Sequence, residues 1–481
     1  MTSSPVTGAR MLIVFALFIL GGCASYRNQA SDYYNYLQRG EYEKASASLD
    51  HTKILSKSRN KLLLLLEKGK LAHLRGHWEE SNTFLNEADN IIEDGLNRSG
   101  NFIAGTLINP MMSQYQPESF ERYLVHYYKA LNYIQLGQNS EAVVEARRIS
   151  LSTFALQDLQ KNENKYSSDP FAYMFQGLIY ENNGDANNAF IAYRNAVDLY
   201  LEKGGVFYGT PLPAQLRKDL FRAAAAAGFM DEVSRYENIF GSRYTPEPVN
   251  PNGELILFWE NGAAPVKEQQ DFFFSLLAGG DGLFYFRDNN NFYNIPLDRS
   301  IAGSSFNPAD VRSFRMAIPR YRQSRSVFQN ATVILPNGQV NMEMAENINA
   351  LAVVSLDQRM GKELASALTR MAVKKIAEAA VRPKEDKKTD NANKTEEEKK
   401  KDEKKKNTAE AISLGLQLFN LASEKADTRN WQSLPASIYY ARIPLVPGEN
   451  KISLQVQGRV IEVNVSAKPG MQFQNISSFN N

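Results

Sequence analysis

Apolar residues in the first half of the chain recur three and four positions apart, and glycines interrupt this pattern at intervals. The spacing is that of an α-helix with one buried face. The glycines that end the apolar segments are Gly40, Gly76, Gly137 and Gly184, with a weaker copy around Gly228. We expect each of these glycines to take a positive φ, which ends one helix and lets a second helix fold back against it.

Small residues stand at fixed distances from these glycines. One lies seven positions before the glycine in three copies, and one lies five positions after it in four copies: Gly69, Ala130, Gly177, Ala45, Ser81, Ala142 and Ala189. This frame resembles the tetratricopeptide repeat, in which small residues let two antiparallel helices approach closely. One repeat cannot bury its apolar face alone, so neighbours stack into a solenoid. The alternative is an ordinary helical bundle with an accidental glycine spacing.

The repeats are unevenly spaced. Successive turn glycines lie 36, 61 and 47 residues apart, whereas a regular array has about 34 residues per repeat. The longest gap contains Asn101–Pro117, where glycine and proline interrupt the helical pattern. We expect this segment to be a functional loop or a flap over the solenoid.

The second half of the chain changes to short apolar runs separated by glycine and proline, beginning after Pro246. Such runs are typical of strands, and their number favours a β-sandwich-like module. The predicted strands are Leu255–Trp259, Gly282–Arg287, Phe314–Pro319, Thr332–Leu335, Ile438–Ile443, Lys451–Val456 and Val460–Val465. The last two flank Gln457 and Gly458, which indicates a hairpin.

Helical patterns interrupt this β-rich module at about 347–381 and 409–423. Between them, residues 384–406 are almost entirely charged or polar and offer nothing to a core. The sequence therefore predicts an α+β protein, with a tetratricopeptide-like helical solenoid followed by a β-rich module that carries a helical insertion. We expect three parts: a signal peptide at 1–22, the helical repeat domain at 23–245 and the β-rich module at 246–481.

The N-terminus carries an apolar run, Met11–Leu20, that leads into Gly21, Gly22 and Cys23. A basic residue before about ten apolar residues and a small-residue site is typical of a secretory signal peptide. Leu20-Gly21-Gly22-Cys23 resembles the lipobox of bacterial lipoproteins. The resemblance implies cleavage before Cys23, acylation of its thiol with fatty acids such as palmitate, and a membrane anchor. Because Ala24 rather than aspartate follows, it implies the outer membrane, with the chain facing the periplasm. The alternative is a chance cysteine after a generic signal.

Two further stretches resemble an uncharacterised family of repeat-bearing bacterial lipoproteins. The first runs from Pro117 to Arg148 and includes the helical stretch His126–Tyr133. The second comprises Asp427–Trp431, Leu434–Ala436 and Pro447–Glu449. Genes of that family often lie near lipoprotein activators of penicillin-binding proteins, which implies a link to peptidoglycan synthesis. No catalytic residue is assigned by the resemblance.

Composition excludes several classes of function. The formal net charge of +2 gives no electrostatic basis for nucleic-acid binding. One cysteine allows no internal disulfide, and four histidines without metal-ligand spacing indicate no metal site and no cofactor. We find no nucleophile motif and no phosphate-binding loop, so we expect no catalytic residue.

Two groups of polar residues leave a catalytic function as an alternative. Glu118 and Glu121 are a carboxylate pair of the kind that hydrolyses glycans. Helix pairing is also expected to gather Glu121 with His126, Arg147 and Arg148, and a satisfied interhelix network is the interpretation that we favour for this group.

Solenoids bind proteins or peptides along their concave face. Alignment of the copies predicts that one polar and aromatic set lines this groove: Lys70, His73, Tyr127, Gln135, Glu181 and Asn182. We expect Tyr127 to be an exposed anchor there. The main hypothesis is a non-enzymatic, lipid-anchored adaptor for an unidentified envelope protein or peptide. The alternatives are an envelope glycan-binding protein or hydrolase, an accessory of secretion or polysaccharide export, and a groove filled by the 101–117 loop.

Overall fold

The computed structural model describes residues 26–97, 110–160, 168–278, 283–287, 292–298, 314–323, 331–335, 338–358 and 425–479. Several sequence predictions therefore lie outside the described residues. They are the signal peptide and Cys23, the charged segment 384–406, the helix expected at 409–423, and the part of the helix expected at 347–381 that follows residue 358.

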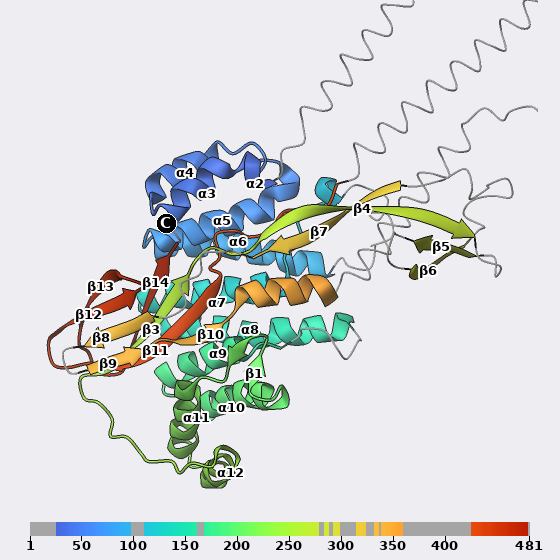
Figure 1. The fold of residues 1–481 in the computed structure, drawn as a ribbon. Helices are drawn as coiled ribbons and strands as arrows, with labels where there is room; N and C mark the ends of the chain where they lie inside the picture. Colours follow the sequence, from blue (N-terminus) through green and yellow to red (C-terminus); the bar gives the residue numbers. More distant parts are fainter. Residues whose placement is uncertain are drawn as a thin grey trace, which may run out of the picture.

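The first half of the described chain is an array of five antiparallel helix pairs, stacked from α3 and α4 to α11 and α12 (Figure 1). A short helix, α2 (Tyr26–Gln29), comes before them, and the 3₁₀ turns η1 (Ser58–Asn60) and η4 (Pro110–Met112) lie between pairs. The pairs are α3 (Ser31–Gln38) with α4 (Tyr42–Asp50), α5 (Lys61–Leu74) with α6 (Trp78–Asn97), α7 (Ser119–Gln135) with α8 (Asn139–Gln160), α9 (Pro170–Asn182) with α10 (Ala186–Glu202), and α11 (Ala214–Ala226) with α12 (Met230–Phe240).

Each pair turns at the predicted glycine with the same backbone geometry. Gly40, Gly76, Gly137, Gly184 and Gly228 have φ between +70° and +79°. In each turn the glycine N–H donates to the carbonyl three residues earlier, and the next N–H donates to the carbonyl five residues before it. This pattern satisfies the last carbonyls of the first helix. The helical repeat is therefore confirmed, and its turn is one motif used five times.

Glycine also allows two helix pairs to approach closely. A Cβ built on Gly69 would lie 2.6 Å from Leu85 of α6, and one on Gly177 would lie 2.4 Å from Tyr193 of α10. Both distances are shorter than any van der Waals contact. Gly69 and Gly177 therefore allow the close helix–helix packing that was predicted for the small residues of the repeat.

The second half forms antiparallel-rich sheets. Their strands are β3 (Glu254–Asn261), β4 (Val266–Ala278), β5 (Leu283–Arg287), β6 (Phe292–Asp298), β7 (Phe314–Arg322), β8 (Ala331–Leu335), β9 (Gly338–Asn341), β10 (Glu343–Glu346), β11 (Ser437–Pro444), β12 (Glu449–Val456), β13 (Arg459–Ser466) and β14 (Met471–Ser478). The sheet orders are β10-β11-β3-β14, β13-β12-β8-β9 and β6-β5-β4-β7. A two-stranded ribbon, β1 (Val206–Phe207) with β2 (Thr210–Pro211), lies within the helical half.

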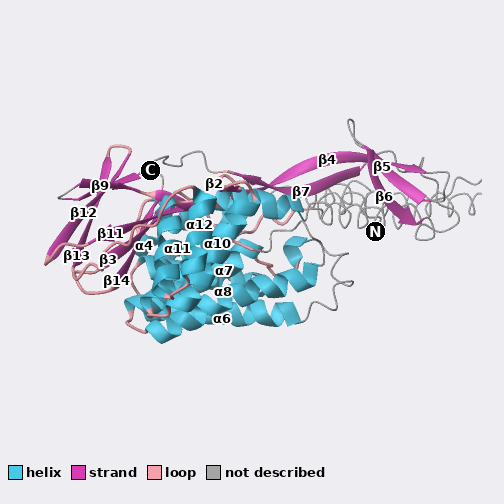
Figure 2. Ribbon diagram, turned by 90° about the horizontal axis from the view of Figure 1, so that it is seen from below, coloured by secondary structure: helices cyan, strands magenta, loops and turns pink. Residues whose placement is uncertain are grey.

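The first of these sheets lies between the helices and the second sheet, so that the body has three layers (Figure 2). Along β3, Ile256 and Phe258 join the core shared with the helices, whereas Leu255, Leu257 and Trp259 join the core between the two sheets. This strand is buried on both faces, which explains why its apolar run does not alternate. The first and second sheets form the expected sandwich, and the α+β organisation is confirmed.

All seven predicted strands are present, and β12 and β13 form the predicted hairpin with positive φ at Gln457 and Gly458. The prediction missed β4, β6, β9, β10 and β14. The residues of β14 alternate weakly between polar and apolar, and this strand pairs in parallel with β3, more than 200 residues earlier. Such pairing leaves no local signal.

The third sheet forms an arm: β4 and β7 run out of the body as a long ribbon towards β5 and β6 (Figures 1 and 2). The start of the helix predicted at 347 is present as a helix over 348–358. Within the described ranges, none of the helices combines the length and the apolar character needed to cross a membrane.

A valine at Gly184 tests the repeat turn. Gly184 has φ +75°, and nothing lies within 4 Å of a Cβ built there. Gly184→Val therefore adds backbone strain without a clash, and we expect it to lower the free energy of unfolding by about 1 kcal/mol or more. The matched control is Gly95→Ala in α6, where a Cβ also meets nothing. That change should leave stability unchanged or raise it by up to about 1 kcal/mol. Equal urea midpoints for the two variants would contradict the turn assignment.

Candidate functional site

The predicted groove face is occupied by the chain's own strands. Five of its six residues contact β3, β11 or β14. The contacts are Lys70 to Glu260, His73 to Asn475, Tyr127 to Phe258, Gln135 to the Phe473 carbonyl, and Glu181 to Arg442. The sixth, Asn182, is half-buried at the end of α9. The six positions do lie on one face of the helical array, and most of that face is covered by contacts with strands of the same chain.

At the centre of this face, Lys70 of α5 forms an ion pair with Glu260 of β3. The Lys70 Nζ lies 2.5 Å from the Glu260 Oε2, and the two side chains are 0% and 1% exposed. Asn475 and Ser477 of β14 also donate to the Glu260 carboxylate, at 2.6 and 2.5 Å. Although burial alone would raise the pKa of Glu260, the charge of Lys70 and the hydrogen bonds from Lys70 and Ser477 hold it below its ordinary value. The ion pair joins the helical array to two strands of the sheet at once.

His73 extends this network to the neighbouring helices. Its Nδ1 lies 2.6 Å from the Asn132 Oδ1 on α7, and its Nε2 lies 3.0 Å from the Asn475 Oδ1 on β14. Burial, followed by the charge of Lys70, lowers the pKa of His73 to about 4. The imidazole is therefore neutral at neutral pH, and its single N–H donates to one of these two oxygens.

Tyr127 is not the exposed anchor that we expected, and the prediction was wrong on this point. Its side chain is 1% exposed. Its ring centroid lies 4.8 to 5.8 Å from those of Phe171, Phe175 and Phe258. Phe258 comes from β3, so the aromatic cluster is part of the core between helices and sheet. A ring at this position of the repeat faces the concave side, and here that side is covered.

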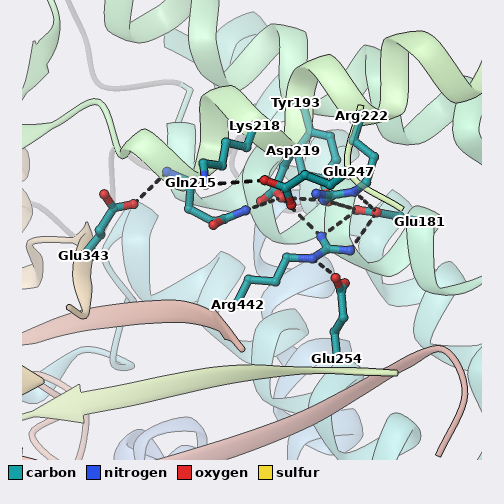
Figure 3. Close-up of polar contacts among 10 residues, drawn as sticks. All are labelled: Glu181, Tyr193, Gln215, Lys218, Asp219, Arg222, Glu247, Glu254, Glu343 and Arg442. Carbon is teal, nitrogen blue, oxygen red and sulfur yellow. Dashed lines mark hydrogen bonds and ion pairs between the residues drawn. The ribbon is translucent and has the colours of Figure 1, made fainter. Parts of the chain in front are cut away.

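A second cluster of charges closes the far end of the groove around Arg442 of β11 (Figure 3). Its guanidinium donates to Glu181 of α9 at 2.9 Å, to Asp219 of α11 at 3.2 Å and to Glu254 of β3 at 2.6 Å. Arg222 donates to the same Glu181 at 2.7 Å. Burial alone would raise the pKa of Glu181, but the two guanidinium groups lower it to about 2. Glu181 is therefore a permanent anion that holds α9, α11 and β11 together.

The segment 425–436, which leads into β11, is held at the opposite end of the groove. Arg429 is fully buried, and its Nη1 donates to the Asn60 Oδ1 at 2.7 Å and to the Ser113 carbonyl at 3.0 Å. Asp427 accepts from its Nη2 at 2.6 Å. Ser113 belongs to the described part of the loop predicted at 101–117, which therefore packs here. Among the described residues, strands fill the groove, and residues 110–117 of that loop pack at its end.

Two helix glutamates recognise the backbone of this segment. The Trp431 N–H donates to the Glu121 carboxylate at 2.8 Å, and the Gln432 N–H donates to the Glu67 carboxylate at 3.1 Å. Glu121 also accepts from the Glu118 N–H, and the two residues form a capping box at the start of α7. The carboxylate pair considered for glycan hydrolysis is thus buried and used to hold structure.

Three buried carboxyl groups at this interface have raised pKa values. Burial raises the pKa of Glu67 to about 7, although the Tyr33 and Tyr34 hydroxyls donate to it at 2.9 and 2.8 Å. The pKa of Glu121 is raised by burial and then by the charge of Glu118. Burial and the neighbouring Asp169 raise that of Glu346 in β10 well above its ordinary value. Each of these acids is at most 4% exposed, so a dissolved substrate cannot reach it.

The expected group of Glu121, His126, Arg147 and Arg148 forms only in part. His126 and Arg148 come together, but Glu121 lies with Trp431 and Arg147 is exposed. The partners of His126 and Arg148 are instead Asp89 of α6 and Glu145 of α8: Glu145 lies 2.7 Å from the His126 Nδ1, and Asp89 lies 2.6 Å from the Arg148 Nη1. His126 and Arg148 thus belong to a network between helices in which every charged group has a partner, as the second of the two interpretations expected.

Asp89, His126 and Glu145 have atoms close enough together to hold a metal ion. However, the Lys129 ammonium lies 2.9 Å from both carboxylates, with its side chain 1% exposed. The lysine thus supplies a positive charge at the place where a metal would bind. The donor set does not fit a metal ion as long as Lys129 is charged.

Comparison with known proteins adds little to this description. No protein-family model matches the sequence, and no curated protein matches it either. Among solved structures, a Podosopora anserina kinesin light chain protein with nearly identical TPR-like repeats aligns at 18% identity over 45% of this chain and 93% of that chain, with a TM-score of 0.31.

Two further solved structures align in the same way. The MamA protein aligns at 14% identity over 45% of this chain and 96% of that chain, with a TM-score of 0.26. BtubC from P. vanneervenii aligns at 16% identity over 50% and 90%, with a TM-score of 0.31. Likenesses this weak say nothing about function. The assignment of the repeat rests on the helix pairs and their turns.

Removal of Lys70 tests the ion pair at the centre of the groove. Lys70→Met leaves the Glu260 charge buried without its partner, and we expect a loss of about 3–5 kcal/mol in the free energy of unfolding. In the double variant Lys70→Met/Glu260→Gln no charge is left unpaired, so the loss should be smaller. Lys44→Met is the control, since its pair with Glu41 is exposed, and it should leave the urea midpoint nearly unchanged. Urea denaturation measures all three. A single variant no less stable than the double variant would contradict the argument.

The buried acid Glu67 predicts a pH dependence with a defined sign. Its pKa is about 7 in the folded chain and 4.5 for the free side chain, so the folded state binds more protons between these values. Stability should therefore fall as pH rises from about 4.5 to about 7, by up to about 3 kcal/mol from this group, and then level off.

Glu67→Gln keeps the shape of the side chain and removes the titration. The difference in unfolding free energy between wild type and Glu67→Gln, measured by urea denaturation across this pH range, should change in favour of the variant as pH rises. Parallel pH profiles for the two proteins would overturn the assignment.

Proposed function

We propose that this chain is a non-enzymatic, lipid-anchored scaffold of the bacterial cell envelope, held by Cys23 in the outer membrane and facing the periplasm. In this proposal it binds other envelope proteins and organises them. The anchor rests on the lipobox-like sequence Leu20-Gly21-Gly22-Cys23. Two or more acyl chains would hold the chain almost permanently, because each buried methylene contributes about 0.8 kcal/mol.

The observation that carries the scaffold proposal is the filled groove. An array of helix pairs whose concave face binds the first sheet of its own β-sandwich shares one core with that sheet, from Tyr26 to Phe479 among the described residues. Such a body presents its partner surfaces on the outside: the second helix of each pair, the outer sheet and the β4–β7 arm. The groove residues that we predicted as a partner site then act as the interior support of these surfaces.

A hydrolase of envelope glycans is the second candidate, and the acids argue against it. A glycan hydrolase needs a carboxyl group of raised pKa in an open cleft, beside a second carboxylate. Among the described residues, the carboxyl groups of raised pKa are Glu67, Glu121 and Glu346, and all three are buried in the interface between helices and C-terminal strands. This favours the scaffold over the hydrolase.

A place in peptidoglycan synthesis is the finer form of the proposal. It is supported by the resemblance of 117–148 and 427–449 to repeat-bearing lipoproteins encoded near activators of penicillin-binding proteins. Within the structure, the second stretch contains Arg429 and Trp431, which are both 0% exposed and hold the C-terminal segment on the helices. The stretches that carry the resemblance thus include residues that hold the C-terminal strands on the helical array.

Two variants test the anchor. Cys23→Ala should abolish labelling by a palmitate analogue and release the chain from outer-membrane fractions, because the thiol that carries the lipid is gone. Ala24→Asp should keep the label and move the chain towards the inner membrane, as expected for a lipoprotein with aspartate after its cysteine. Fractionation of labelled cells measures both.

The scaffold function is read in the same cells. Complexes captured by envelope crosslinking with the wild-type chain should be lost with Cys23→Ala. A labelled, membrane-bound Cys23→Ala chain would refute the anchor. Unchanged crosslinked complexes, recovered with a released and unlabelled variant, would refute the need for the anchor in partner binding.

A further inference from the structure

A pocket of about 460 Å³ opens where the second and third helix pairs meet. Its walls come from η1 and the start of α5, the end of α6, and residues 114–117 before α7. Leu62, Ile91 and Ile92 form an apolar side. Arg59, Lys61 and Arg122 add three positive charges to the lining. No contact described above uses this pocket.

The two arginines carry unsatisfied donors. The Nε and Nη1 of Arg122 and the Nε of Arg59 are shielded from solvent and have no hydrogen-bond partner among the described residues. Arg122 follows Glu118 and Glu121 on α7, but neither pairs with it. Glu118 holds Lys267 at 2.5 Å, and Glu121 accepts from Trp431. The acids that the sequence places beside Arg122 are therefore committed elsewhere.

The charge balance of the pocket favours an anion. The described lining residues include three cations and one acid, Asp94, which is exposed. Lys61 is paired with Glu87 outside, at 2.5 Å, so the lining cations without a direct ion pair among the described residues are Arg59 and Arg122, the latter with Glu118 and Glu121 nearby. Guanidinium N–H groups that are shielded from solvent and have no acceptor are costly. Two planar guanidinium groups match the geometry of an oxyanion, and a phosphate group has enough free oxygens to accept from both.

We propose that this pocket binds a phosphate group whose carrier places an apolar portion against Leu62, Ile91 and Ile92. Arg59 and Arg122 donate to the phosphate oxygens. The volume exceeds that of phosphate alone, which leaves room for the carrier. A phospholipid headgroup and a small phosphate ester share this chemistry. The inference needs neither the anchor nor the scaffold role, so it can fail or succeed apart from both.

The test titrates inorganic phosphate into the full chain at constant ionic strength, with chloride as the reference, and follows heat and melting temperature. Phosphate should raise the melting temperature of the wild type. Arg59→Gln and Arg122→Gln should each weaken phosphate binding at least tenfold. Arg147→Gln removes the same charge from the exposed face of α8 and should bind as the wild type does.

A measurement without phosphate and one further variant separate the effect on binding from the effect on folding. Without phosphate, Arg122→Gln should melt no lower than the wild type, because it removes a cation that lacks a partner. Arg122→Lys keeps the charge but not the planar fork, and it should bind more weakly than the wild type. No effect of phosphate on the wild type, or an equal loss in Arg147→Gln, would overturn the proposal.

The source of the phosphate is decided by a parallel titration with monomeric short-chain phosphatidylglycerol. Tighter binding of this lipid than of inorganic phosphate, lost in Arg122→Gln, supports the site and assigns it to a lipid headgroup. Binding of inorganic phosphate alone supports the site and assigns it to a small phosphate ligand. Binding of neither leaves the pocket without its ligand and refutes the inference.

Discussion

The ion pair between Lys70 and Glu260 is the constraint on which the arrangement of the two halves depends. Both charges are removed from water, and a buried charge is tolerated only when it is paired and hydrogen-bonded. Glu260 therefore has to meet Lys70 in one register, with Asn475 and Ser477 beside it. This contact fixes where β3 and β14 lie in the groove. Apolar packing alone would allow the sheet to slide along the helices.

At the two ends of the groove, the Arg442 cluster and the 425–436 segment also fix the C-terminal half on the helices through buried polar contacts. At each end a charged side chain of the C-terminal half is held by several groups of the helical half. Aromatic rings fill the space between the polar contacts. Polar contacts thus specify the register of the interface and apolar burial supplies its stability, which is the usual division between the two kinds of interaction.

A repeat array usually keeps its concave face for a partner, and here the same chain supplies the occupant. The backbone of 431–432 is bound by helix carboxylates much as an extended peptide would be. Since these acids are buried, their raised pKa values report on the interface and not on catalysis. The groove therefore gives the protein a rigid body, and any binding function belongs to surfaces and pockets outside it.

The sequence by itself determined the local structure. Five glycines at turn positions, small residues at fixed offsets and short apolar runs predicted the helix pairs and seven strands, because turns and periodicity depend on neighbours in the chain. It also placed Lys70, His73, Tyr127 and Glu181 on one face. Only the tertiary structure decided what covers that face. Glu260, Arg442 and Trp431 lie between 190 and 310 residues from the helix residues they contact, Lys70, Glu181 and Glu121, and β14 pairs with β3 from the far end of the chain. Pairings over such distances leave no periodic signal, because they are chosen by complementary charge and shape after the elements have formed.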